Sequence, residues 1–216
     1  MKIVPALLAE DFDEFMARLR QAEAFTGYVQ IDIMDGAFVP TRSFSPERLN
    51  AVTTPLSFEL HLMVRDPLPL IERISNPGLR KILFHFESKA RHADLIDTIH
   101  AGGLEAGLAI RPETAPEDFR AAAERADTLL FLTVDPGHYG SPFRPEVLEK
   151  IAAARRMFPD KTISADGGVS LDNLKDFLNR RVDYVCIGSR IFLKGNPGDN
   201  YRAFVQRLQD LEAVRA

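Results

Sequence analysis

The sequence predicts an α/β protein that folds as a single-domain (β/α)8 barrel. Short apolar runs alternate with amphipathic stretches along all 216 residues, and no linker or low-complexity tract separates them. About eight strand–helix units can be distinguished, which close most economically into a barrel of parallel strands. An open, doubly wound sheet is the alternative, although it more typically contains roughly five to seven units. We therefore expect residues 1–216 to form one domain.

The expected strands are apolar runs rich in β-branched and aromatic residues. They are Lys2–Leu8, Tyr28–Met34, Leu56–Met63, Lys81–Phe86, Glu105–Ile110, Thr128–Val134, Thr162–Asp166 and Tyr184–Gly188. The expected helices occupy the intervals between them. They are Asp11–Phe25, Pro46–Val52, Pro67–Ile74, Ala90–Ala101, Pro116–Ala126, Pro145–Phe158, Ser170–Asn179 and Asn200–Val214. Asp11, Ser45, Asp66 and Ser170 lead four of these helices and are expected N-caps.

The composition is that of a water-soluble globular protein and argues against several classes of function. Hydrophobic residues make up 45% of the chain, and the net charge of −4 argues against a nucleic-acid surface. The single cysteine, Cys186, rules out an internal disulfide framework and fits a reducing cytosol. The first residues turn acidic too early for a signal peptide, and no apolar run approaches transmembrane length. We expect a cytoplasmic protein with no membrane or nucleic-acid partner.

The expected strand Tyr28–Met34 places a carboxylate on a face that should be buried. Its β-branched residues alternate onto one side, and Gln30 and Asp32 fall on the other. If the apolar side packs under helices, Asp32 points into the interior of the barrel. A charge there must be paired, bound to a metal or used in catalysis.

Two further polar residues are expected beside Asp32, because the active site of such a barrel lies at the C-terminal ends of its strands. His61 lies near the end of the third expected strand, and Asp166 ends the seventh. Only strands one and eight separate strands two and seven, so Asp32 and Asp166 should face each other across the mouth. One carboxylate on each face of a substrate is the arrangement that removes a proton from one face of a carbon and returns one to the other.

The intermediate of such a reaction is an enediolate, whose charge needs a cation or strong hydrogen-bond donors. His61 could help to ligate that cation. The alternative is structural: Asp32 caps a loop and Asp166 caps a helix.

Glycine-rich loops follow the last three expected strands and indicate a phosphate site. Gly137–Gly140, Gly167-Gly168 and Gly188-Ser189 occupy these positions. Backbone amides in such loops can hold an anion, and the loops after strands seven and eight are a recurrent phosphate site in this fold. Turns need glycine for other reasons, so no single pair would be sufficient.

These segments together resemble the ribulose-phosphate 3-epimerase family. The segments that carry the resemblance are Pro5–Phe12, Ile31–Pro40, His61–Met63, Thr133–Gly140, Asp166–Val169 and Gly188-Ser189. The most specific of them is Met34-Asp35-Gly36-Ala37-Phe38-Val39-Pro40, which matches a Met-Asp-Gly-x-Phe-Val-Pro signature.

The resemblance implies a (β/α)8 barrel that binds a ketopentose phosphate and inverts its C3 centre, interconverting D-ribulose 5-phosphate and D-xylulose 5-phosphate. It implies that Asp32 and Asp166 are the acid/base pair and, with His61, ligate a divalent metal (Mg, Mn, Fe or Zn). It also implies that the substrate and its phosphate lie against His61 and the three glycine loops, which comprise Gly137, His138, Tyr139, Gly140, Gly167, Gly168, Gly188 and Ser189. A homo-oligomer is a further implication.

The largest departure from the family lies beside Asp32, because Gln30 occupies the position of a metal-binding histidine. A glutamine oxygen can ligate a hard cation but replaces imidazole poorly at zinc. Three alternatives remain open: weaker metal binding that favours Mg²⁺ or Mn²⁺, an enediolate stabilised by the Gln30 amide without metal, or loss of the metal site.

Other departures lie at Ala6, Leu132, His138-Tyr139 and Arg111. They leave open a different phosphorylated sugar as substrate, and the change at Gln30 leaves open a non-catalytic barrel that binds a phosphorylated metabolite. Arg111 is a candidate for attracting an anionic substrate, although a solvated arginine is the simpler interpretation. His85 has two interpretations, a role near the site or, more simply, a core or strand-end histidine.

Overall fold

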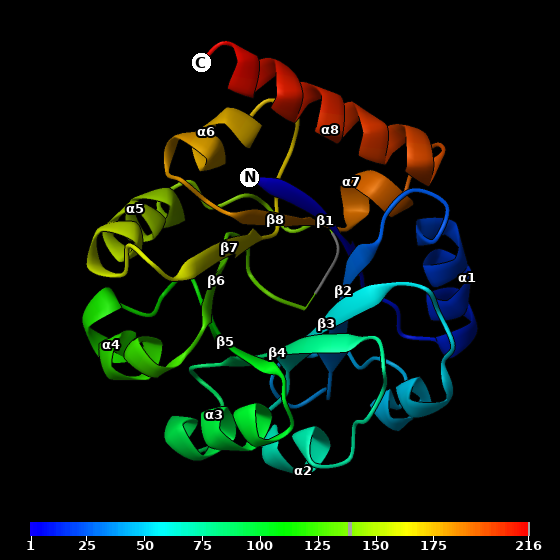
Figure 1. Ribbon diagram of the computed structural model, residues 1–216, viewed down its shortest axis with the longest axis vertical. Coiled ribbons are helices and arrows are strands. Elements are labelled where there is room, and N and C mark those ends of the chain that lie inside the picture. The colour runs from blue at the N-terminus through cyan, green and yellow to red at the C-terminus, as the bar shows by residue number, and fades with distance from the viewer. Residues whose placement is uncertain (138–139, 216) are drawn as a thin grey trace.

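A computed structural model of the protein describes residues 1–137 and 140–215. Within these residues, eight parallel strands form a closed barrel in which neighbours along the chain are also neighbours in the sheet (Figure 1). The first strand pairs with the last as well as with the second, and Lys2 is opposite Tyr184 at this closure. The predicted (β/α)8 fold class is therefore confirmed, and the open sheet is excluded.

The strands agree with the predicted runs to within two residues at each end. They are β1 (Lys2–Leu7), β2 (Tyr28–Met34), β3 (Ser57–Met63), β4 (Leu79–His85), β5 (Glu105–Ile110), β6 (Thr128–Leu132), β7 (Thr162–Asp166) and β8 (Tyr184–Ile187). Every residue of β6 is buried, as expected for a parallel strand that helices cover outside and side chains fill inside.

Most helices are shorter than predicted, whereas the last one begins three residues earlier and is longer. They are α1 (Phe12–Ala22), η1 (Pro46–Ala51), α2 (Leu68–Ile71), α3 (His92–Ala101), α4 (Pro116–Arg125), α5 (Val147–Met157), α6 (Leu174–Asn179), α7 (Ser189–Phe192) and α8 (Pro197–Ala213). The segment after β2 forms a 3-10 helix rather than the predicted α-helix, and α7 was not predicted. Four residues are too few to show helical periodicity in a sequence.

Asp11 is the one predicted N-cap that caps a helix through its side chain, since it accepts hydrogen bonds from the amides of Asp13 and Glu14. Ser45 occupies the N-cap of η1 without a capping bond, and Asp66 and Ser170 lie outside the N-cap positions. Asn196, which was not predicted, caps α8 by accepting from the amide of Asp199.

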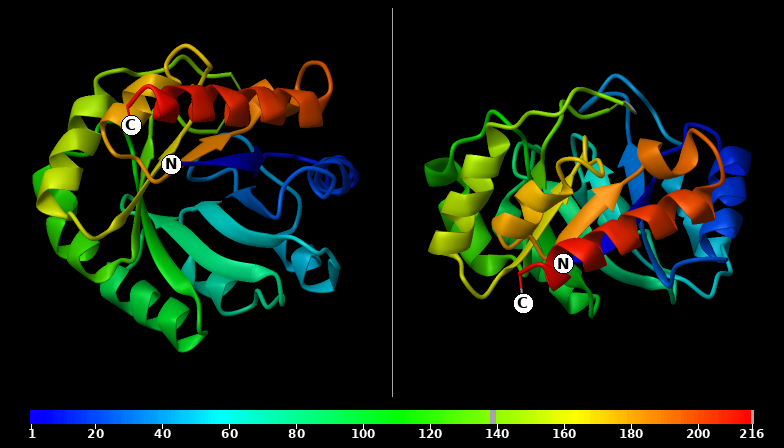
Figure 2. Two further views of the ribbon diagram at one scale, coloured as in Figure 1. Left: turned by 45° about the horizontal axis from the view of Figure 1, so that its top comes forward. Right: turned by 90° about the horizontal axis from the view of Figure 1, so that it is seen from above.

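The main hydrophobic core is the layer between the barrel and its ring of helices (Figures 1 and 2). The outward side chains of β2, Val29, Ile31 and Ile33, are at most 1% exposed. Phe15 of α1 and Phe177 of α6 are fully buried against this surface. Because the outward face is so completely covered, the alternation along β2 directs Gln30 and Asp32 into the barrel.

The inside of the barrel holds buried charges at both ends and a small apolar cluster between them. The cluster is Val4, Ala6, Leu83, Ala109, Leu130 and Cys186. Towards the N-terminal ends of the strands, Glu59 is 2% exposed and lies 3.3 Å from Lys81 Nζ. Its carboxylate also accepts a 3.0 Å hydrogen bond from the Tyr28 hydroxyl. We call Glu59, Lys81 and Tyr28 the lower cluster. Along β4, Leu83 separates Lys81 from His85, which belongs to the upper end.

In the right-hand view of Figure 2, loops rise above the barrel on the side opposite the labelled chain ends. Among the described residues, none of the helices combines the length and the apolar character that a bilayer-spanning segment requires.

Candidate active site

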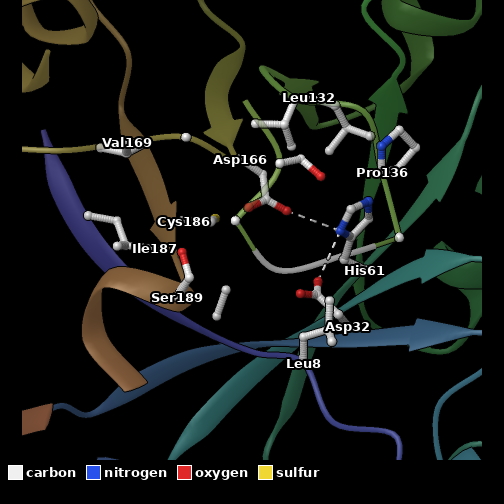
Figure 3. A pocket seen from close by; sticks show the side chains of 18 of the residues that line it. Leu8, Asp32, His61, Leu132, Pro136, Asp166, Val169, Cys186, Ile187 and Ser189 are labelled. Atoms are coloured by element: carbon white, nitrogen blue, oxygen red, sulfur yellow. Dashed lines mark hydrogen bonds and ion pairs between the residues drawn. The ribbon is translucent and has the colours of Figure 1, made fainter. Parts of the chain in front are cut away.

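A pocket opens at the C-terminal ends of the strands and contains most of the predicted site residues (Figure 3). Its lining includes Asp32, His61, Asp166, Gly137, Gly140, Gly167, Gly168, Gly188 and Ser189. The predicted site residues His138 and Tyr139 lie outside the described residues. The strand ends and the three glycine loops are thus brought together as the sequence predicts.

The centre of the pocket is formed by Asp32 from β2, His61 from β3 and Asp166 from β7, whose side chains point towards one another (Figure 3). His61 Nδ1 lies 3.1 Å from Asp32 Oδ1 and 3.3 Å from Asp166 Oδ2. The side chain of His61 is completely buried, and the carboxylates are only slightly exposed towards the pocket. One imidazole nitrogen therefore bridges two carboxylates that come from opposite sides of the barrel closure.

Gln30 forms a second bridge between the same carboxylates. Its Nε2 donates to Asp32 Oδ1 and to Asp166 Oδ2, each at 2.9 Å. The side chain is fully buried, and its Oε1 has no hydrogen-bond partner among the described residues. An unpartnered buried amide oxygen is costly, so the two charged hydrogen bonds on the nitrogen side must outweigh it.

At the centre of the site, two buried carboxylates share the positive charge of one protonated imidazole, that of His61. Burial raises the pKa of Asp32 to about 6, although the hydrogen bond from His61 opposes the rise. Burial opposes the charged form of His61 as well. The hydrogen bonds to Asp166 and Asp32 outweigh that effect and raise its pKa to about 9. At neutral pH the imidazolium form of His61 therefore compensates the carboxylates.

The same three residues could hold a divalent cation. One ligand atom each from Asp32, His61 and Asp166 lies within 4.8 Å of the others. Two carboxylates and an imidazole suit Mg²⁺, Mn²⁺, Fe²⁺ or Zn²⁺. The unpartnered Oε1 of Gln30 would be a fourth ligand atom if a half-turn of the amide exchanged it with Nε2. The donor set therefore fits a divalent cation, with Gln30 as its weakest member.

The loop after β7 depends on glycine for its shape. Gly167 has a φ of +100°, and a Cβ at this position would lie 2.3 Å from a methyl carbon of Val134. Thr133 holds the same loop by donating to the carbonyl of Asp166 at 3.1 Å. The loop therefore brings its backbone to the pocket wall beside Asp166, where no larger residue could follow the same path.

Two residues lie behind His61: His85, for which the sequence left a role near the site open, and Glu87, which it did not identify. His61 Nε2 is 3.0 Å from His85 Nε2, and His85 Nδ1 is 3.1 Å from Glu87 Oε2. Glu87 was not among the predicted site residues. The available signal was its position two residues after His85 at the end of β4, which places both side chains on the same face of the strand. The His85 ring also packs on the ring of Phe38, with centroids 4.7 Å apart.

The departures predicted to reshape the pocket fall into two groups. Ala6 and Leu132 line it. Arg111 does not, because its guanidinium lies 4.1 Å from the centre of the Phe38 ring and donates to the Phe38 carbonyl at 2.9 Å. Arg111 therefore holds the loop after β2 rather than facing the pocket.

Asp35 organises that same loop although it does not line the pocket. Its Oδ1 accepts from the amides of Ala37 and Phe38, both at 2.8 Å, and its Oδ2 accepts from the amide of Arg65 at 2.7 Å. The hydrogen bonds from these backbone amides outweigh burial and lower the pKa of Asp35. The carboxylate joins the loops after β2 and β3.

Solved structures of other proteins share the fold at low sequence identity. Phosphoribosyl anthranilate isomerase from Thermococcus kodakaraensis superimposes with a TM-score of 0.67 and 14% identity, covering 96% of this chain and 98% of that one. Orotidine 5'-monophosphate decarboxylase from Sulfolobus solfataricus gives a TM-score of 0.66 and 16% identity, covering 97% and 98%. These similarities support the barrel and carry no information on the reaction.

Sequence relatives are more specific. Ribulose-phosphate 3-epimerase of Schizosaccharomyces pombe is 30% identical over 202 residues, which cover 91% of this chain and 89% of that protein. The cytoplasmic isoform of ribulose-phosphate 3-epimerase from Oryza sativa is 31% identical, covering 92% and 90%. The profile of the ribulose-phosphate 3 epimerase family matches residues 2–192. This chain therefore belongs to the ribulose-phosphate 3-epimerase family.

Proposed function

We propose that this chain is an isomerase that interconverts D-ribulose 5-phosphate and D-xylulose 5-phosphate, with one of Asp32 and Asp166 removing the C3 proton and the other delivering a proton to the opposite face. The observation that carries the proposal is the pair of carboxylates, from β2 and β7, that one imidazole nitrogen and one amide nitrogen bridge inside the pocket. Family membership supports the reaction and the substrate class.

In one direction, the Asp32 carboxylate removes the C3 proton from one face of the substrate. The electron pair of the C–H bond moves into the C2–C3 bond, and the C2 carbonyl oxygen becomes negatively charged. The carboxylic acid form of Asp166 then protonates C3 from the opposite face and restores the carbonyl. In the reverse direction, the two residues exchange roles.

The environment of Asp32 suits a residue that must both take up and release a proton. A pKa of about 6 keeps most of its carboxylate ionised at neutral pH while the protonated form stays within reach. His61 and Gln30 supply the hydrogen-bond donors that hold both carboxylates in place. The same donors can stabilise the enediolate oxygen.

Asp32, His61 and Asp166 are the residues that would hold a divalent cation, with Gln30 Oε1 as a further ligand. Such a cation would supply Lewis-acid stabilisation of the enediolate oxygen. We assign the phosphate to the backbone of Gly167, Gly168, Gly188 and Ser189 and to the loop from Gly137 to Gly140, as the position of these loops on the pocket supports.

Replacing each aspartate by asparagine tests the proton transfer. Asp32→Asn and Asp166→Asn should each lower turnover with ribulose 5-phosphate by at least about 10³-fold, because one face of C3 loses its acid or base. In D₂O, each variant should still exchange the C3 hydrogen of the one epimer whose proton faces the remaining carboxylate. NMR of both sugar phosphates measures this exchange.

Asp127→Asn is the matched control, since Asp127 accepts from the Ala106 amide far from the pocket. It should leave turnover within about twofold of the wild type, as expected for a surface change. Wild-type turnover in both site variants would rule out the mechanism.

A second candidate substrate is another phosphorylated sugar, epimerised or isomerised at another carbon. The presence of Ala6 and Leu132 on the pocket wall favours it. Deuterium uptake by a panel of sugar phosphates separates the two candidates, and uptake confined to the pentulose phosphates would exclude the second. A complete lack of exchange with every sugar phosphate would instead favour the non-catalytic barrel.

The same family relationship supports two further proposals, on location and on assembly. We expect the protein to act in the cytoplasm and to form a homo-oligomer. Size-exclusion chromatography with light scattering measures the mass of the particle in solution, and a monomer at micromolar concentration would contradict the second expectation.

A further inference from the structure

A buried hydrogen-bonded chain extends from the bridging imidazole away from the pocket, and the proposed reaction makes no use of it. It runs from His61 Nε2 to His85 Nε2 over 3.0 Å and from His85 Nδ1 to Glu87 Oε2 over 3.1 Å. Both histidine side chains are completely buried. Since water does not reach them, the ring nitrogens have to satisfy one another.

The partners determine the direction of every hydrogen bond in this chain. An ionised carboxylate only accepts, so His85 must carry its proton on Nδ1 and donate to Glu87. The two Nε2 atoms, 3.0 Å apart, need one proton between them. His61 faces two carboxylates through Nδ1 and is therefore the ring that holds the extra proton, so its Nε2 donates and His85 Nε2 accepts. The Nδ1 of His61 is consequently the nitrogen that remains for Asp32 and Asp166.

Glu87 is itself held so that it cannot turn its acceptors elsewhere. Its Oε1 accepts from the backbone amide of Arg111 at 3.0 Å and from the hydroxyl of Thr114. Burial would raise its pKa, but the donors His85, Thr114 and Arg111 outweigh burial and lower the pKa to about 2. Burial lowers the pKa of His85 to about 4, against the effect of Glu87. A neutral histidine between an anion and His61 agrees with the direction deduced from the geometry.

We propose that Glu87 and His85 are positioning residues that hold a proton on His61 Nε2, so that Nδ1, which faces Asp32 and Asp166, is the nitrogen that gives up its proton to a bound cation. The proposal rests on the proposed site, and it extends that site by one strand to the end of β4. It follows the general pattern in which a carboxylate behind a histidine selects the nitrogen that acts.

The isosteric substitution Glu87→Gln should reverse the direction of the hydrogen bonds that link residue 87, His85 and His61. The Arg111 amide is a fixed donor, so the glutamine oxygen must face it and the glutamine NH₂ must face His85. His85 would then accept on Nδ1 and donate from Nε2, and His61 would accept on Nε2 and carry its proton on Nδ1. The nitrogen needed by a cation would be blocked, and Mn²⁺ affinity should fall about 10-fold or more.

Two measurements on the metal-free and metal-titrated protein test the proposal. ¹⁵N NMR of histidine-labelled protein should show His85 protonated on Nδ1 in the wild type and on Nε2 in Glu87→Gln. Calorimetric titration with Mn²⁺ gives the affinity. Thr114→Val is the matched control, because it removes a donor to Glu87 without supplying a new one and should preserve both results. Glu87→Asp keeps an acceptor-only carboxylate and should retain the wild-type tautomer.

A wild-type spectrum with His85 protonated on Nε2 would overturn the proposal, even if Glu87→Gln failed to fold. So would a folded Glu87→Gln protein with unchanged tautomers and Mn²⁺ affinity. Neither measurement depends on turnover. A failure of the proposed epimerase activity would instead appear in the turnover of the Asp32→Asn and Asp166→Asn variants, so the two proposals can fail independently.

Discussion

The two ends of the barrel interior both contain buried carboxylates, but they compensate the charge in different ways. In the lower cluster, Glu59 faces Lys81 at 3.3 Å and accepts from Tyr28. At the upper end, Asp32 and Asp166 share an imidazole and an amide. A lysine ammonium is a built-in cation, whereas an imidazolium proton can be replaced by a metal or lost. The comparison teaches that buried charge becomes reactive only where its counter-charge can be exchanged.

The first prediction breaks the lower cluster. Lys81→Met should lower the free energy of unfolding by about 3–5 kcal/mol, because Glu59 is left buried without its cation. Urea unfolding measures the loss. The double variant Glu59→Leu, Lys81→Met removes both charges and should recover most of it, with turnover close to that of the wild type. Equal instability of the single and double variants would show that packing, rather than charge, governs this end.

The second prediction concerns the upper end, where the counter-charge should titrate. The folded-state pKa of His61 is raised from 6.5 to about 9, so its stabilisation is fully present below pH 6.5 and lost as the pH rises through about 9. In metal-free protein the unfolding free energy should fall with a slope approaching about 1.4 kcal/mol per pH unit inside this window. Urea unfolding between pH 6.5 and 9.5 measures the slope.

Saturating Mn²⁺ should reverse this trend, because a cation on Nδ1 displaces the proton and binds better as the pH rises. His100→Gln is the control. His100 also contacts a carboxylate, that of Asp127 at 2.8 Å, but on the exposed surface, and its loss should leave the slope unchanged. A flat profile for the metal-free protein would contradict the idea that an imidazolium compensates Asp32 and Asp166.

The third prediction sharpens the comparison at a single residue. Gln30→His should raise affinity for Zn²⁺ by about 10-fold or more, because imidazole is the better zinc ligand and the other three donors stay in place. Calorimetric titration measures the affinity, and the same titration of Gln30→Leu is the matched comparison. Equal affinities in all three proteins would show that residue 30 is not a ligand.

The barrel was predictable because apolar residues alternate along β2 and mark the face of the strand that helices cover. Helices cover that outward face around the whole barrel, so the pattern repeats from strand to strand. The sequence predicted Asp32, His61 and Asp166 as a group because the order of strands in a closed barrel follows the chain. It predicted a helix at η1 but not its 3-10 form, and it missed α7, since a segment of four residues shows no helical period. It offered Arg111 as a candidate for attracting the substrate and a solvated arginine as the simpler interpretation, whereas the guanidinium packs on Phe38.

The finer chemistry could not be predicted from residue types. The direction in which the Gln30 amide faces depends on two carboxylates from different strands. The contact of His85 with His61 depends on rotamers inside the barrel. Glu87 follows β4 as an ordinary surface-type residue, and only the Arg111 amide and His85 reveal its orientation.

The three hydrogen bonds that Asp35 accepts change how the most specific motif of this chain should be understood. The Met-Asp-Gly-x-Phe-Val-Pro signature contains an acidic residue, yet that residue bends a loop and fastens it to the next one. The bend delivers the Phe38 ring onto His85. A match to this signature therefore indicates a shared scaffold. Whether a relative retains the reaction has to be decided from the positions of Asp32, His61 and Asp166, which lie outside the signature.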